Sequence, residues 1–262
     1  RKNGDSAVRK YEQKFNGRKT SQLRVSEKEI KEAQSKISRK ERSALRDMSA
    51  RLLSRQKILA NPWLEVGSVY RDFVPIPSVG CYIPGGQARY PSSVVMSVVP
   101  ARKAGVKRIV VVSPPNRDGK IDPLTIVAAK MCGATEIYKV GGAQAIGALA
   151  YGTKSIPKVD KIVGPGGKFV SIAKLLVSDQ TAIDMVAGPT ELGIIADASS
   201  DPDLVALDLI SQAEHSKDTM CFVITQSKIM AKQIQKSIEK LIPGTERSSI
   251  IKESISKNGF IA

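Results

Sequence analysis

His215 is the single histidine of this 262-residue chain, and it follows a helical pattern that also carries Asp208 and Gln212. Residues three and four apart lie on one face of a helix, so these side chains can offer oxygen and nitrogen donors to one cation. Residues 181–220 hold eight acidic residues and one basic residue, a net charge of −7 that would attract a cation. A lone imidazole near a helix C-terminus can instead interact with the last backbone carbonyls and bind nothing. The spacing alone favours that structural role, because zinc usually takes three or four protein ligands.

Three glycine-rich loops are the second feature that could bind a ligand. Residues 140–144 and 164–167 each follow a predicted strand and open a predicted helix, and residues 82–86 precede a further helix. Free backbone N–H groups at the positive end of a helix suit an anion or a polar ligand. None of the loops has the spacing G-x-G-x-x-G, so the standard dinucleotide fingerprint is absent. Each loop taken singly could be a tight turn that binds nothing. Because three such loops lie at comparable positions, a site for a dinucleotide or similar ligand is as well supported as three simple turns.

The elements that must position these residues alternate between strand and helix. The pattern predicts strands at residues 107–113, 136–140 and 161–163, helices at 122–131, 143–151 and 168–178, and further strands at 192–196 and 222–225. Such alternation predicts βαβ units and parallel sheets, whose ligands lie at the carboxyl ends of the strands. We therefore predict an α/β fold with two Rossmann-like parallel-sheet domains, helices on both faces, preceded by an N-terminal helical segment.

The positive charge of the chain is concentrated in its first sixty residues. The net charge is +16, and residues 1–60 hold 18 Lys and Arg against 7 Asp and Glu, or +11. This segment has helical patterns at residues 6–15, 26–33 and 38–59, in which bases alternate with acids, and its only aromatics are Tyr11 and Phe15. A nucleic-acid groove would need a concentrated basic stripe and stacking aromatics. A solvated helical face is favoured, and nucleic-acid binding is the weakest alternative.

Composition also bears on the compartment. The sequence has no run of about 18 apolar residues that would span a membrane, and it lacks a charged-then-apolar signal segment. Cys81, Cys132 and Cys221 are odd in number and widely spaced, which indicates free thiols in a reducing cytoplasm. Cys81 is expected to be a buried strand thiol, because no second histidine is present to activate it as a nucleophile.

Five ordered motifs carry more information than any single loop. They are residues 79–86 (VGCYIPGG), 140–146 (VGGAQAI), 159–166 (VDKIVGPG), 183–191 (IDMVAGPTE) and 211–215 (SQAEH). Their sequences, order and spacing resemble those of the histidinol dehydrogenases over nearly the whole chain. The resemblance implies the NAD-dependent oxidation of L-histidinol through L-histidinal to L-histidine, in a cytoplasmic homodimer whose zinc ion positions the substrate.

The resemblance also implies roles for particular residues. Gln212 and His215 match zinc ligands that also contact the substrate, and Thr190 stands where the family usually has a substrate-contacting serine. Tyr82 and Gln144 match positions that contact NAD.

A third NAD-contacting position departs from the family pattern. The family usually has asparagine at the end of Gly-Pro-Gly-Asn, and Gly167 stands there in this chain. That difference removes one side-chain hydrogen bond.

The resemblance finally implies a domain organisation. Residues 81–190 would form the NAD-binding domain, and residues 1–80 with 191–262 a discontinuous zinc and substrate domain. Family members continue past the equivalent of Ala262 into a Glu-His pair that supplies the acid–base groups, then an Asp and a His that complete the zinc shell. We therefore expect no catalytic acid–base residue in this sequence. It is either truncated at both ends, as a start at Arg1 suggests, or it belongs to a noncatalytic NAD-binding or ligand-binding homologue.

Overall fold

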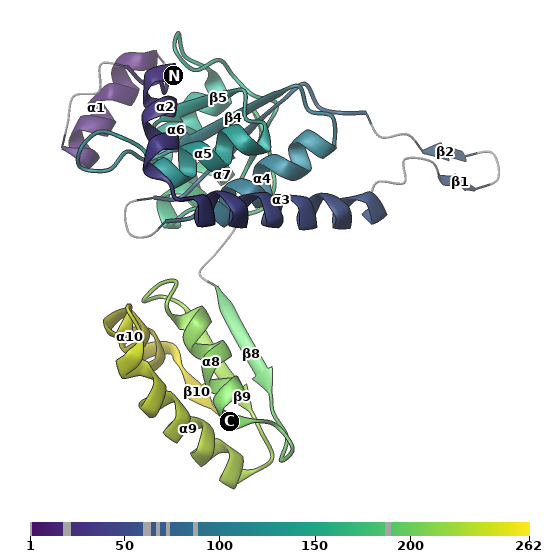
Figure 1. Ribbon diagram of the computed structural model, residues 1–262, viewed down its shortest axis with the longest axis vertical. Helices are drawn as coiled ribbons and strands as arrows, with labels where there is room; N and C mark the ends of the chain where they lie inside the picture. The colour runs from purple at the N-terminus through teal and green to yellow at the C-terminus, as the bar shows by residue number, and fades with distance from the viewer. Residues whose placement is uncertain are drawn as a thin grey trace. The chain divides into compact units, whose positions relative to one another are not determined.

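The computed structural model describes residues 2–17, 22–59, 64–66, 69–71, 74–85, 89–186 and 190–262. They form two compact units, a large unit Arg1–Val186 and a small unit Ala187–Ala262 (Figure 1).

The large unit begins with helices and continues with alternating strands and helices. Its elements are α1 (Gly4–Asn16), α2 (Glu27–Lys36), α3 (Arg39–Leu59), β1 (Leu64–Val66), β2 (Val69–Arg71), β3 (Ser78–Tyr82), α4 (Pro91–Lys103), β4 (Arg108–Ser113), α5 (Pro123–Cys132), β5 (Glu136–Lys139), α6 (Gly142–Tyr151), β6 (Lys161–Val163), α7 (Lys168–Leu176) and β7 (Ala182–Ile183). Strands β1 and β2 form an antiparallel pair of their own.

The small unit continues the alternation. Its elements are β8 (Glu191–Ile195), α8 (Pro202–Ala213), β9 (Met220–Ile224), α9 (Lys228–Leu241), the short 3-10 helix η1 (Ile242–Gly244), α10 (Ser248–Asn258) and β10 (Phe260–Ile261). The predicted strands and helices after residue 107 are all confirmed to within a few residues.

The large sheet is parallel, with β3 in the middle. Among the described residues its strand order is β5-β4-β3-β6-β7, so the chain first adds strands on one side of β3 and then returns to the other side. The order therefore reverses between β3 and β6. In open parallel sheets a crevice forms at such a reversal, outside the carboxyl ends of the two strands.

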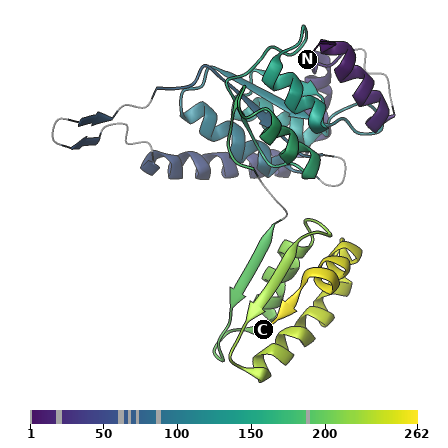
Figure 2. The same cartoon turned by 180° about the vertical axis from the view of Figure 1, so that it is seen from behind.

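Both faces of the large sheet are buried, which explains its continuous apolar strands. In β4, Ile109 and Val111 belong to a core shared with α2, α3, α4 and α5, while Val110 and Val112 belong to a core shared with α1 and α6. Figure 2, seen from behind, brings α6 and α7 in front of the sheet. Because successive residues of a strand point to opposite faces, a strand buried on both sides needs an unbroken run of apolar residues.

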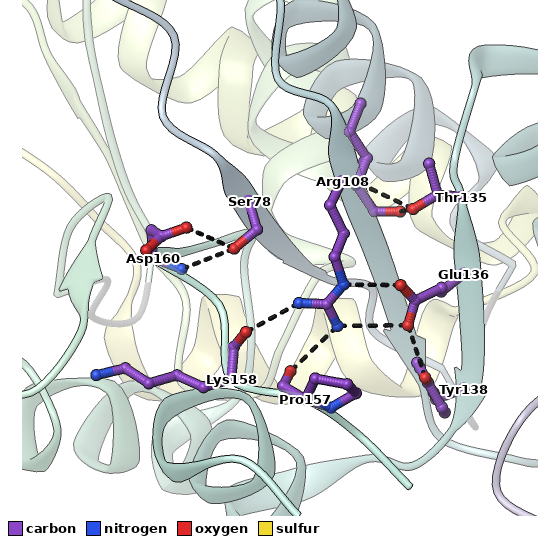
Figure 3. Close-up of polar contacts among 9 residues, drawn as sticks. Ser78, Arg108, Thr135, Glu136, Tyr138, Pro157, Lys158 and Asp160 are labelled. Atoms are coloured by element: carbon purple, nitrogen blue, oxygen red, sulfur yellow. Dashed lines mark hydrogen bonds and ion pairs between the residues drawn. The ribbon is translucent and has the colours of Figure 1, made fainter.

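Polar groups tie together the amino ends of β4 and β5 (Figure 3). The guanidinium of Arg108 donates to both carboxylate oxygens of Glu136, at 2.7 and 3.3 Å, and to the carbonyls of Pro157 and Lys158, at 3.1 and 2.9 Å. The phenol of Tyr138 donates to Glu136 at 2.6 Å. Burial raises the pKa of Glu136, but the hydrogen bonds from Arg108 and Tyr138 outweigh it and hold the pKa below its usual value.

The small sheet is also parallel, with the order β10-β9-β8. Leu192, Ile194, Cys221 and Val223 point to one face and pack against α8, α9 and α10. Within the described residues of the small unit, α8, α9 and α10 all pack on this one face of the sheet. The physical reason is that the chain adds β9 and β10 in one direction. Right-handed crossovers then place every helix on the same side, whereas the reversal in the large sheet uses both sides.

The N-terminal helices belong to the large unit. Helices α2 and α3 pack on α4 and α5, and α1 packs on α6. The observed division at residues 186 and 187 differs from the expected grouping of residues 1–80 with 191–262. A boundary at residues 80 and 81 would cut β3, whose five residues are all buried.

The three cysteines are free, as the sequence predicted, and all are buried, which had been expected of Cys81. Burial raises the pKa of the Cys81 thiol to about 12, which makes it unsuited to act as a nucleophile. No helix in the described part of the chain is long and apolar enough to cross a membrane.

Candidate functional site

The first candidate site is the loop between β5 and α6. Tyr82, the last residue of β3, is buried, and its Oη accepts a hydrogen bond from the N–H of Gly142 at 3.1 Å. Gln144 lies in the first turn of α6, and its Nε2 donates to Oε1 of Glu12 at 2.7 Å. The same carboxylate oxygen accepts from the N–H of Gly141 at 3.0 Å. The structure thus brings Tyr82 and Gln144, which sequence resemblance assigned to the cofactor, to the same loop.

Glu12 is a residue of this loop that sequence reasoning missed. It lies on α1, is fully buried, and contacts the amino end of α6, the helix on which α1 packs. Val8, one helical turn earlier on the same face, is buried as well. The sequence signal that could have identified Glu12 is its place four residues after Val8, on the apolar face of a helix. A carboxylate on such a face is buried only where a specific partner compensates its charge.

The second loop follows β6, across the order reversal from β3. Gly164 has a φ of +111°, and a β-carbon on it would lie 2.2 Å from the carbonyl oxygen of Tyr82, so glycine is required. Its N–H donates to Oδ2 of Asp184 at 2.8 Å, and its carbonyl accepts from Nζ of Lys174 at 3.1 Å. Lys174 is almost fully buried and forms an ion pair with Asp184. Burial raises the pKa of Asp184, but hydrogen bonds from Lys174, Gly164 and Met185 bring it below its usual value.

Gly167 ends this second loop and is the N-cap of α7. Its φ of −68° is open to any residue, and a β-carbon there would meet nothing within 4 Å. Its carbonyl accepts hydrogen bonds from Val170 and Ser171, at 2.8 and 3.1 Å. The local structure therefore does not require glycine and has room for the side chain that the resemblance expects.

The third candidate site lies in the small unit, after α8. Gln212 is in the last turn of α8, and His215 follows the helix end by two residues. The His215 N–H donates to the carbonyl of Gln212 at 3.1 Å, and Nδ1 lies 3.1 Å from the same oxygen. A proton on Nδ1 shared with a carbonyl leaves the lone pair on Nε2, which is the usual arrangement of a metal-binding histidine. His215 is exposed, so Nε2 is accessible.

Thr190 lies at the same edge of the small sheet. It precedes β8, is exposed, and its carbonyl accepts from the N–H of Met220, the first residue of β9, at 3.1 Å. Since β8 and β9 are parallel, Thr190 and the turn that carries His215 share the amino edge of the sheet. This edge is opposite to the carboxyl edge that usually binds ligands in parallel sheets.

Gln212 and His215 supply an amide oxygen and an imidazole nitrogen, which are suitable zinc donors. They lie beside the C-terminus of α8, whose partial negative charge favours a cation. Among the described residues no group of three or more His, Cys, Asp or Glu side chains converges on a metal position. Zinc usually takes three or four protein ligands, so this pair fits part of a coordination shell.

These features define an α/β protein with a Rossmann-like parallel sheet and a second unit that carries candidate metal ligands. A search of family models gives a match to histidinol dehydrogenase over residues 1–262. The chain therefore belongs to the histidinol dehydrogenase family.

Individual relatives agree with this assignment. The chain is 46% identical to histidinol dehydrogenase of Bacillus cereus and 42% identical to that of Methanothermobacter thermautotrophicus, in both cases over 100% of the chain and 62% of the relative. The crystal structure of histidinol dehydrogenase from Elizabethkingia anophelis matches with a TM-score of 0.94 and 34% identity, over 98% of this chain and 61% of that chain. The chain thus spans about 62% of the length of the curated relatives it matches.

Proposed function

We propose that this protein takes part in the NAD-dependent oxidation of L-histidinol through L-histidinal to L-histidine. The observation that carries the proposal is the family match over every residue of the chain. The contacts of Tyr82 and Gln144 with one loop and with Glu12 support it, because the family resemblance assigns both residues to the same ligand.

NAD would bind at the carboxyl edge of the large sheet, where it supplies the hydride acceptor. Tyr82 and Gln144 would hydrogen-bond the cofactor from one side of the order reversal. The loop that runs from Gly164 to Gly167 would let it approach the backbone from the other side. Gly167 would contribute its peptide but no side-chain hydrogen bond, which predicts weaker NAD binding than asparagine would give.

Zinc would be held by Gln212 and His215, and when bound it would anchor and orient the substrate. Thr190 would contact the substrate from the same edge of the small sheet. The Glu-His pair that the family uses for proton transfer cannot lie within these residues, because His215 is their single histidine. We propose that this pair and the remaining zinc ligands come from outside residues 1–262, with one ligand from the partner of a homodimer. The buried free cysteines are consistent with a cytoplasmic enzyme.

The test separates binding from catalysis. Calorimetric titration with NAD should show saturable binding that is weakened by Tyr82→Phe and Gln144→Met. Zinc-loaded protein that also includes the Glu-His pair should form NADH when L-histidinol is added. NAD binding without NADH formation in that protein would favour a noncatalytic homologue, and absence of both would contradict the proposal.

A further inference from the structure

The cofactor loop holds a carboxylate that the proposed function does not use. Glu12 comes from α1, 129 residues before Gly141, and sits fully buried at the amino end of α6. An acidic side chain in this position satisfies the free N–H of Gly141 and interacts favourably with the helix dipole. A phosphate group could not be held at the same position, because the carboxylate already fills it with negative charge.

The same carboxylate decides which way the amide of Gln144 points. A carboxylate oxygen accepts hydrogen bonds, so the atom of Gln144 that lies 2.7 Å from it must be the NH₂ nitrogen. The carbonyl oxygen Oε1 then lies on the other side, over Gly142, where it is 2.9 Å from the position that a β-carbon of Gly142 would take. Gln144 is partly exposed, so this oxygen is available to a ligand.

Tyr82 complements this acceptor with a donor. Its oxygen accepts from the N–H of Gly142, which leaves the phenol proton to be donated elsewhere. Burial raises the pKa of Tyr82, so the phenol keeps its proton at neutral pH. Gly142 is thus flanked by one donor, Tyr82 Oη, and one acceptor, Gln144 Oε1.

We propose that Glu12 is a positioning residue that fixes the Gln144 amide with its oxygen toward the bound cofactor, so that Tyr82 and Gln144 together bind a group carrying both an acceptor and a donor. A carboxamide or a pair of ribose hydroxyls has this chemistry, and a phosphate does not, because it offers acceptors alone at neutral pH. This inference rests on the proposed binding of NAD and deepens it.

A double-mutant cycle on the full chain tests the inference, with NAD affinity measured by calorimetry. Glu12→Met keeps the volume of the side chain but removes the acceptor, and it should weaken NAD binding about tenfold, as expected for loss of one hydrogen bond to a charged group. Gln144→Met should have a similar effect. Adding Glu12→Met to Gln144→Met should not lower the NAD affinity further, because Glu12 acts through the amide that Gln144→Met has already removed.

Two controls distinguish positioning from general stability. Glu12→Gln retains an acceptor oxygen and should bind NAD within about threefold of the unaltered chain. Val8→Ala removes packing from the same face of α1 and should lower the melting temperature without changing NAD affinity. Should Glu12→Met not fold, Glu12→Ser takes its place in the cycle.

The outcomes are distinct. Additive losses in the cycle, or a folded Glu12→Met protein with unaltered NAD affinity, would overturn the positioning role while leaving NAD binding intact. If the unaltered chain does not bind NAD at millimolar concentration, the proposed cofactor and this inference fail together.

Discussion

Lys174 and Asp184 clamp a single residue, Gly164, between them: Nζ of Lys174 donates to the carbonyl of Gly164, and Oδ2 of Asp184 accepts from its N–H. The two charged residues also pair with one another. The loop at the order reversal of the large sheet is therefore fixed by an ion pair whose lysine is almost fully buried.

Breaking this clamp should destabilise the fold. Lys174→Met removes the buried ammonium that pairs with Asp184 and donates to the carbonyl of Gly164, and we expect a loss of about 2–3 kcal/mol in the free energy of unfolding. Lys168→Met, at an exposed position on the same helix, is the matched control and should change it by less than about 0.5 kcal/mol. Urea denaturation measures both. Similar losses in the two variants would show that the clamp contributes little.

Gly164 should be irreplaceable for two separable reasons. Gly119 has a φ of +79° and open space around it, so Gly119→Ala tests the effect of positive φ alone. This substitution should lower the free energy of unfolding by about 1–2 kcal/mol. Gly164→Ala adds the collision with the Tyr82 carbonyl and should cost at least about 2 kcal/mol more. Thermal unfolding of the two variants gives the comparison. Equal costs would mean that the loop can move away from β3.

Gly167→Asn should strengthen NAD binding. The backbone conformation and the open space allow the side chain, so the stability should change by less than about 0.5 kcal/mol. One added hydrogen bond should raise the affinity about three- to tenfold. Gly167→Ala is the control, since it adds a β-carbon without an amide and should leave the affinity as it is. Calorimetric titration with NAD checks both variants, and equal gains in the two would point to backbone rigidity instead.

Glu136 should make stability sensitive to acid. Its pKa in the folded chain lies below the ordinary value of 4.5, so its stabilising contribution is complete above pH 4.5 and is lost as the pH falls through the folded value. Glu136→Gln should therefore lose stability at pH 7 and show a shallower decline between pH 5 and about pH 3 than the unaltered chain. Urea midpoints across this range measure the slope. The exposed Glu27→Gln should keep the original slope, and an unchanged slope in Glu136→Gln would contradict the assignment.

Zinc binding should depend on His215. His215→Ala removes the imidazole of the candidate pair and should lower zinc affinity at least about tenfold in a competition assay with a chelating dye. Ser216→Ala, the adjacent residue, removes a hydroxyl that bonds the N–H of Asp218 and should have no comparable effect. If the two variants bind zinc equally well, the metal is held elsewhere.

The regular elements could be predicted because their signals are local. The run Ile109–Val112 identified a strand buried on both faces, because successive residues of a strand point to opposite sides. The expected domain boundary after residue 80 falls inside β3, whose place in the middle of the sheet depends on its pairing with β4 and β6.

The site was predictable only where a family motif covered it. The motifs identified Tyr82 and Gln144, but their common contact with the Gly141–Gly142 loop depends on the order of strands, which spacing does not specify. Glu12 shows the limit more clearly. Periodicity places Glu12 on the buried face of α1. Its hydrogen-bond partners lie more than a hundred residues later in the chain, and the sequence around Glu12 does not identify them.

The central position of β3 has a consequence for how the protein is made. Domains fold as the chain leaves the ribosome, and β3 is the first strand of the large sheet to emerge, so β4 and β5 can assemble beside it at once. Its other edge stays bare until β6 has been synthesised, about eighty residues later. The seam of β3 and β6, beside which the proposed cofactor site lies, is therefore created late in translation, after the first half of the sheet has been synthesised.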